Sequence, residues 1–190
     1  MLTPEQYLGE VAERVQRAGG RLSTVQLGPV TAVVGLFTEP APLPATNHCV
    51  IVAAVPEVSA AALADFTARA RQHARANLTG WTTASIVLAG LVGQRVHPDA
   101  ALAASAKPGH RFGGETRMVA VDLSTGQLST FGGDTVVRGS VNAKLTYCFP
   151  PPNEAGRPRV PPPPYAGPVG PRPPVRPPPG LAPQRSPYGG

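Results

Sequence analysis

The side chains to consider first for acid–base or metal chemistry are His48, His97, Asp99 and His110. Imidazole and carboxylate groups exchange protons and bind metal ions such as zinc. Three of them lie in one glycine-containing stretch, but their spacing is not the regular spacing of a zinc motif. We therefore predict no metal ion and no cofactor, and interpret His97 and Asp99 as a turn followed by a helix cap. If the chain is a small enzyme, its site should lie near these four residues.

The two cysteines offer little further chemistry. His48 and Cys49 are neighbours in an expected strand, so their side chains point to opposite faces and cannot form a catalytic pair. Cys49 and Cys148 are about a hundred positions apart, which is neither a metal-ligand spacing nor a disulfide framework. We predict two reduced, partly buried thiols.

Other catalytic motifs are missing from the sequence. Gly109, Gly113 and Gly114 are close together but lack the lysine and hydroxyl of a phosphate-binding loop, and there is no Gly-x-Ser-x-Gly elbow. Arg69, Arg71 and Arg75 lie on or beside the outer face of an expected helix, where charges are usually solvated. The sequence therefore favours a protein that is not an enzyme.

Proline divides the chain into two parts. Eight of the 25 prolines lie in residues 1–148 and the other 17 lie in residues 150–187. Proline fixes φ and removes an amide donor, so such a density excludes helices and sheets. We predict an α/β domain over residues 1–148 and a disordered tail over residues 149–190. The tail holds five arginines and one acid, and so accounts for most of the net charge of +6.

The tail contains two patterns of proline-dependent recognition. The first, centred on Pro162, Pro163 and Tyr165, resembles ligands of WW domains. The second, with Pro171, Pro174 and Arg176, resembles an SH3 ligand that ends in arginine. A preformed polyproline helix enters an aromatic groove with little loss of entropy. We expect a protein partner, and the alternative is nonspecific contact of the arginines with nucleic acid or an anionic surface.

The expected elements alternate between helical and strand patterns. Thr3, Pro4 and Gln6 begin a helix with a capping box. A continuous apolar run over residues 49–55 predicts a central strand buried on both faces. The remaining elements are strands over 22–27, 31–37, 85–92 and 141–147, helices over 59–77 and 98–106, and a hairpin over 119–131. This order predicts an α/β or α+β fold, with two main helices packed on a mixed sheet of about six strands.

The order helix, three strands, helix, strand resembles the core of restriction-endonuclease-like folds. Those enzymes hold a metal ion with carboxylates and a lysine on their central strands. Residues 31–37 carry no acid, and residues 49–55 carry neither an acid nor a lysine. Metal-dependent cleavage of phosphodiesters is therefore excluded on the expected strands.

Three short strings are similar to those of a group of uncharacterised bacterial α/β proteins of the actinobacterial type. They begin at Ala45, Val96 and Val121, and the resemblance covers about residues 3–131. It implies no activity, cofactor or functional residue. The sequence also shows no signal peptide and no apolar run of spanning length, so we expect a cytoplasmic protein. We predict a non-enzymatic protein-interaction module with an extended tail.

Overall fold

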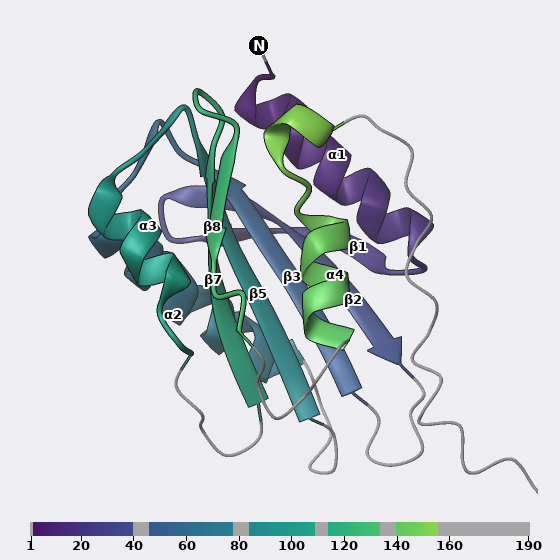
Figure 1. Cartoon of the computed structure of the whole chain (residues 1–190). Helices are drawn as coiled ribbons and strands as arrows, with labels where there is room; N and C mark the ends of the chain where they lie inside the picture. Colours follow the sequence, from purple (N-terminus) through teal and green to yellow (C-terminus); the bar gives the residue numbers. More distant parts are fainter. Residues whose placement is uncertain (1, 40–45, 78–83, 109–113, 134–139, 156–190) are drawn as a thin grey trace, which may run out of the picture.

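The computed structural model describes residues 2–39, 46–77, 84–108, 114–133 and 140–155 (Figure 1). The helices are α1 (Pro4–Arg17), α2 (Ala60–Asn77), α3 (Pro98–Ser105) and α4 (Ser140–Cys148), followed by a short 3-10 helix, η1 (Pro152–Glu154). The strands are β1 (Arg21–Leu27), β2 (Val30–Glu39), β3 (Thr46–Ala54), β4 (Glu57–Val58), β5 (Ala84–Gly93), β6 (Arg95–Val96), β7 (Gly114–Asp122) and β8 (Gln127–Thr130).

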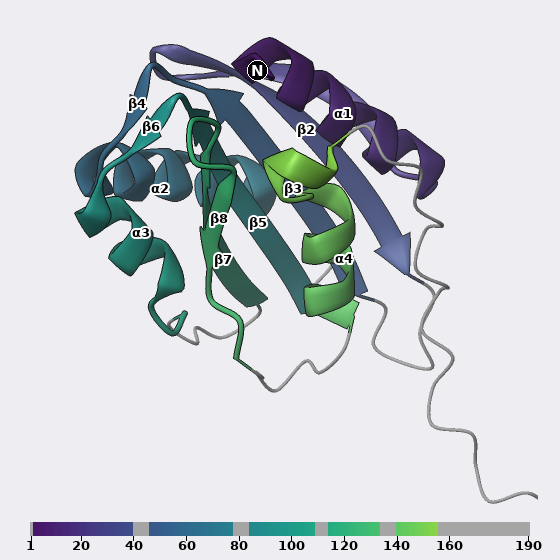
Figure 2. The same cartoon turned by 45° about the horizontal axis from the view of Figure 1, so that its top comes forward.

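Six strands form one mixed sheet in the order β1-β2-β3-β5-β7-β8. The central strands β3, β5 and β7 are parallel, while β1, β2 and β8 join them by antiparallel pairing. Strands β4 and β6 form a small separate parallel pair. Helices α1 and α4 cover one face of the main sheet and α2 and α3 cover the other (Figures 1 and 2). The predicted mixed sheet of about six strands with helices packed on it is confirmed.

Strand β3 lies at the centre of the hydrophobic core, as its continuous apolar sequence predicts. Val50 and Val52 point into the layer beneath α1 and α4, and Cys49 and Ile51 point into the layer beneath α2 and α3. All four are buried. Because side chains alternate along a strand, only an uninterrupted apolar run can fill both layers.

Helix α1 begins where its sequence predicts. The backbone N–H of Gln6 donates to Thr3 Oγ1 at 3.2 Å, and the backbone N–H of Thr3 donates to Gln6 Oε1 at 2.9 Å, which completes the capping box. The helix then lies close against β2 because that strand offers a glycine. A Cβ atom at Gly35 would be 2.6 Å from Cγ1 of Val15. Any side chain at Gly35 would push α1 away from the sheet.

Helix α2 also matches the prediction. The Ser59 hydroxyl accepts a hydrogen bond from the Ala62 amide at 3.2 Å, and Val58 and Leu63 are both buried at the start of the helix. The buried residues along α2 are Leu63, Phe66, Ala70 and Ala74, the predicted inner stripe.

The prediction of a strand over residues 141–147 is wrong, because this segment forms helix α4. Val141, Leu145 and Cys148 are buried, and their spacing of four and three residues is helical rather than alternating. The segment packs across the face of the sheet instead of joining its edge. Its β-branched and aromatic residues favour a strand locally, but burial of one helical face against the sheet outweighs that preference.

The folded domain also continues past the predicted boundary at Cys148. Phe149 is 1% exposed, and it packs so closely on β5 that a Cβ atom at Gly90 would lie 2.5 Å from its ring. The Tyr7 hydroxyl donates a hydrogen bond of 2.7 Å to the Pro150 carbonyl, and η1 follows directly. Residues through Ala155 therefore belong to the domain. The rest of the predicted tail, residues 156–190, lies outside the described residues, as do all its recognition patterns.

Membrane insertion through a helix finds no support in the described ranges, where no helix is both long and apolar enough to span a bilayer.

Candidate functional site

His48 lies in β3, where the structure buries it completely beneath α1 and α4. Its register partners on the two neighbouring strands are Phe37 and Ile86, both members of the same hydrophobic layer. The adjacent Cys49 points into the opposite layer. The prediction that these two side chains cannot act as a catalytic pair is therefore confirmed.

His97 and Asp99 lie at the other end of the sheet. His48 is level with the start of β5, whereas His97 follows β6, beyond the end of β5. The His97 Nε2 atom is 2.9 Å from Glu57 Oε2, and the exposed Asp99 accepts the amide hydrogen of Ala100 at 2.8 Å. The structure therefore does not bring His48 together with His97 and Asp99.

Metal binding has no visible basis in the part of the chain that the structure describes. No group of three or more histidine, cysteine, aspartate or glutamate side chains is placed there to hold an ion. His110 lies outside the described residues, so its place relative to His97 and Asp99 is not part of the described structure.

Both cysteines are free and buried, as predicted for reduced thiols, but their burial is complete rather than partial. Cys49 belongs to the layer beneath α2, and Cys148 belongs to the layer beneath α1 and α4. Burial raises the pKa of each thiol to about 12. Neither sulfur is therefore the reactive thiolate that nucleophilic chemistry needs.

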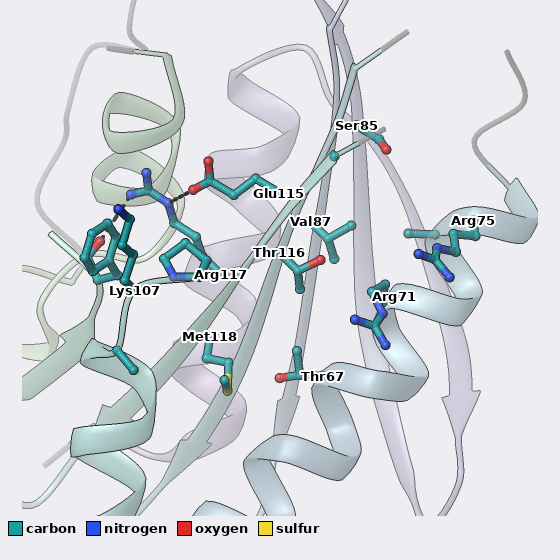
Figure 3. A pocket seen from close by; sticks show the side chains of 15 residues that line it. Thr67, Arg71, Arg75, Ser85, Val87, Lys107, Glu115, Thr116, Arg117 and Met118 are labelled. Carbon is teal, nitrogen blue, oxygen red and sulfur yellow. Dashed lines mark hydrogen bonds and ion pairs between the residues drawn. The ribbon is translucent and has the colours of Figure 1, made fainter. Parts of the chain in front are cut away.

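The structure instead reveals a basic pocket on the face of the sheet that carries α2 and α3. It is a cavity of about 450 Å³ between the C-terminal half of α2, the residues after α3 and the starts of β5 and β7. Arg71 and Arg75 extend from α2, and Lys107 follows α3 on the other side (Figure 3). Ser85 and Thr116 come from the paired starts of β5 and β7.

The local sequence explains why the strands meet closely at this pocket. β7 begins with Gly114, whose register partner is Ser85. A Cβ atom at Gly114 would lie 2.3 Å from the Ser85 carbonyl oxygen. Only glycine allows this approach of the two backbones.

A buried ion pair stands at the β7 edge of the basic pocket. Arg117 Nε is 2.5 Å from Glu115 Oε1, and both side chains are almost wholly buried. Arg117 also donates to the Phe131 carbonyl oxygen and to Asn142 Oδ1, and its guanidinium lies 5.6 Å from the centre of the Phe131 ring. Because these two charges compensate each other, the charge that the pocket presents to solvent comes from Arg71, Arg75 and Lys107.

The described lining of the basic pocket is suited to binding an anion through charged and hydroxyl groups. Its described lining contains no histidine, cysteine or aspartate, and its only carboxylate, Glu115, is paired with Arg117. The hydroxyls of Thr67, Ser85 and Thr116 can donate or accept hydrogen bonds.

Sequence reasoning found Arg71 and Arg75 but placed them on a solvated helix face. The pocket takes residues from five separate segments, so no local motif marks it. The only sign of the pocket in the sequence was the presence of three arginines in the second half of α2. Lys107 and the start of β7 join them only through the parallel pairing of β5 with β7.

Comparison of the chain with protein-family models, with curated proteins and with solved structures finds no match.

Proposed function

We propose that the chain is a non-enzymatic protein-interaction module, in which the α/β domain carries a proline- and arginine-rich tail that binds a partner protein. The main support is the separation of the residues that would have to catalyse a reaction. His48 lies buried at one end of the sheet, and His97 and Asp99 lie at the other. A catalytic set needs its groups within hydrogen-bonding reach of one substrate.

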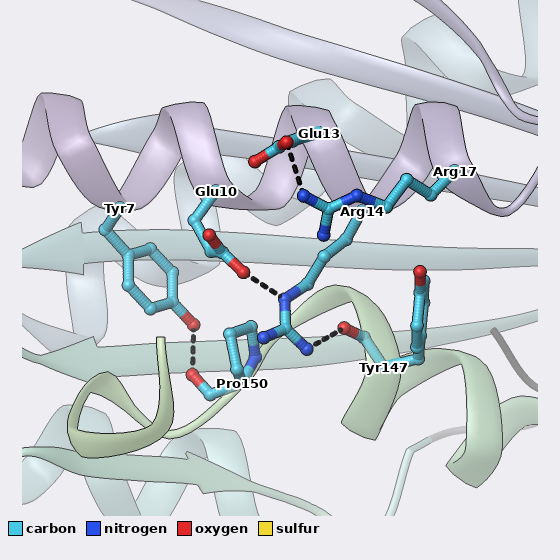
Figure 4. Close-up of polar contacts among 7 residues, drawn as sticks. All are labelled: Tyr7, Glu10, Glu13, Arg14, Arg17, Tyr147 and Pro150. Atoms are coloured by element: carbon cyan, nitrogen blue, oxygen red, sulfur yellow. Dashed lines mark hydrogen bonds and ion pairs between the residues drawn. The ribbon is translucent and has the colours of Figure 1, made fainter. Parts of the chain in front are cut away.

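The segment that leads into the tail is held firmly on the domain, which supports a role of the domain in presenting the tail. The Phe149 side chain is buried in the core, and the Tyr7 hydroxyl donates to the Pro150 carbonyl (Figure 4). Near the end of α4, the Tyr147 carbonyl accepts a hydrogen bond of 3.2 Å from the guanidinium of the buried Arg14. A tail that leaves from a fixed point beside α1 holds its bound partner at a high local concentration next to the domain.

The partner is a domain with an aromatic groove that reads polyproline segments. Pro162, Pro163 and Tyr165 provide one such ligand, and Pro171, Pro174 and Arg176 provide a second that ends in a positive charge. Two ligands on one tail can engage two domains of a partner and strengthen binding through avidity.

The alternative is a small enzyme with a site near His48, His97, Asp99 and His110. Such a site requires His48 to lie near the other three residues. The structure separates His48 from His97 and Asp99. No described geometry favours this reading over the interaction module.

The test is quantitative affinity purification from a lysate of the source organism, with the full chain as bait. One variant replaces Pro162, Pro163 and Tyr165 by alanine, and a second replaces Pro171, Pro174 and Arg176 by alanine. We expect a specific partner that the full chain recovers and that one or both variants lose. A partner recovered equally well by a chain carrying both sets of substitutions would contradict the proposal.

Salt distinguishes polyproline recognition from charge alone. Binding through the arginines to nucleic acid or an anionic surface should collapse as the salt concentration rises, and proline substitutions should leave it unchanged. Recognition of the proline motifs should survive moderate salt because it depends on apolar contact in a groove. Arg157→Gln with Arg185→Gln is a matched control that lowers the tail's charge while keeping both motif sets.

A further inference from the structure

We propose that the basic pocket binds the phosphate group of a small organic phosphate monoester. The argument begins with the three cations around it. Arg71 is half-buried, while Arg75 and Lys107 are exposed, and none of the three has an ion-pair partner among the described residues. Other arginines of the helices are paired: Arg69 with Asp65 at 2.8 Å, for example.

The arrangement of Arg71 and Arg75 favours an anion between them. They are four residues apart on α2, so they lie one turn apart on the same side of the helix. Two like charges at this spacing repel each other, and a bound anion removes that repulsion. Guanidinium groups offer paired N–H donors that match the oxygens of phosphate, and Lys107 supplies a third charge from the opposite wall.

The number of charges favours phosphate over a single carboxylate. A phosphate monoester carries a charge of about −1.5 to −2 near neutral pH. Three cations without a competing free carboxylate in the described lining match a dianion better than a monoanion. The wall also includes Thr67, whose Oγ1 is buried and makes no hydrogen bond. A ligand that adds an acceptor to this wall can relieve such a buried group.

The volume and the apolar lining of the pocket indicate that the ligand has an organic group as well as the phosphate. A volume of about 450 Å³ lies within the range of small-molecule sites, which is far more than one inorganic ion occupies. Apolar side chains, among them Val87, Met118 and Phe131, also line the cavity. The ester group should lie against these side chains while the phosphate contacts the cations.

Phenyl phosphate, titrated into the full chain by isothermal calorimetry, is the first probe. We expect saturable binding of one equivalent, weaker binding of inorganic phosphate, and little or no binding of benzyl alcohol. Chemical-shift changes should appear at the amides of Ser85, Thr116 and Met118, which places the ligand in the pocket rather than on the tail. Absence of saturable binding at millimolar phenyl phosphate would overturn the proposal.

Variants assign the binding to the cations. Arg71→Gln with Arg75→Gln should weaken binding of phenyl phosphate by about tenfold or more, since each change removes a charge-assisted contact. Arg69→Gln is the control, because it removes one positive charge from the same helix outside the pocket and should change affinity less than about twofold. Equal losses in both would show that general surface charge binds the probe. Unchanged binding in the double variant would place the ligand elsewhere, and circular dichroism checks that each variant is folded.

Discussion

Deletion of all residues after Cys148 should remove most of the domain's stability, because it removes the packing of residues 149–155. The deletion removes the Phe149 ring, which is 1% exposed, and the Pro150 carbonyl that accepts the Tyr7 hydroxyl. Loss of a buried phenylalanine costs about 3–5 kcal/mol and an unsatisfied buried hydroxyl costs about 1–3 kcal/mol. The total free energy of unfolding of a domain of this size is about 5–15 kcal/mol.

Urea unfolding followed by far-ultraviolet circular dichroism measures this effect. A chain that ends at Cys148 should unfold at a much lower urea concentration than the full chain, or be unfolded without urea. A chain that ends at Ala155 keeps every described contact and should stay within about 1 kcal/mol of the full chain. In the full chain, Phe149→Ala should isolate the loss of the buried ring, and Tyr7→Phe should remove the same hydrogen bond from its donor side. Equal midpoints for the chains that end at Cys148 and at Ala155 would refute the packing of residues 149–155 on the sheet.

Three further outcomes follow from the core and from buried ionisable groups. Val52→Asp should unfold the domain because it places an unpaired carboxylate at a fully buried site, whereas Gln72→Asp on the exposed side of α2 should leave the thermal midpoint nearly unchanged. Burial acts to raise the pKa of Asp122, but hydrogen bonds from neighbouring amides and a hydroxyl outweigh it and lower that pKa. Asp122 should therefore stabilise the domain above about pH 4 and lose this effect as the pH falls through its folded-state pKa. Urea midpoints of wild type and Asp122→Asn should accordingly converge in acid, and a constant difference down to pH 2 would contradict this. Cys49 and Cys148, with pKa values raised to about 12, should resist a thiol reagent at pH 8 and react only after denaturation; rapid labelling of the native protein would show that the layers open.

Elements with strong local signals could be predicted from the sequence. Thr3 and Gln6 begin α1 through contacts three residues apart, and the apolar run of β3 has no competing helical pattern. The segment of α4 lacked such a signal because Val141, Thr146 and Tyr147 are residues that strands favour. Its helical form depends on packing against the sheet, which a local pattern does not contain.

The basic pocket could not be predicted for a related reason. Arg71 and Arg75 look like any charged helix face until Lys107 and the start of β7 are placed opposite them. That placement depends on the parallel register of Ser85 with Gly114, a pairing across a long crossover. Parallel register leaves no short-range mark comparable to the glycine of a hairpin turn.

The contact between Tyr7 and Pro150 also constrains the order of events during synthesis of the protein. Its two partners are 143 positions apart, so the ribosome must translate nearly the whole domain before α1 can acquire its final neighbours. Until then the apolar side of α1, including Val11 and Val15, has no α4 to pack beside. Closure of the layer beneath α1 and α4 is therefore a late step in the folding of the domain, because it needs segments from both ends of the domain.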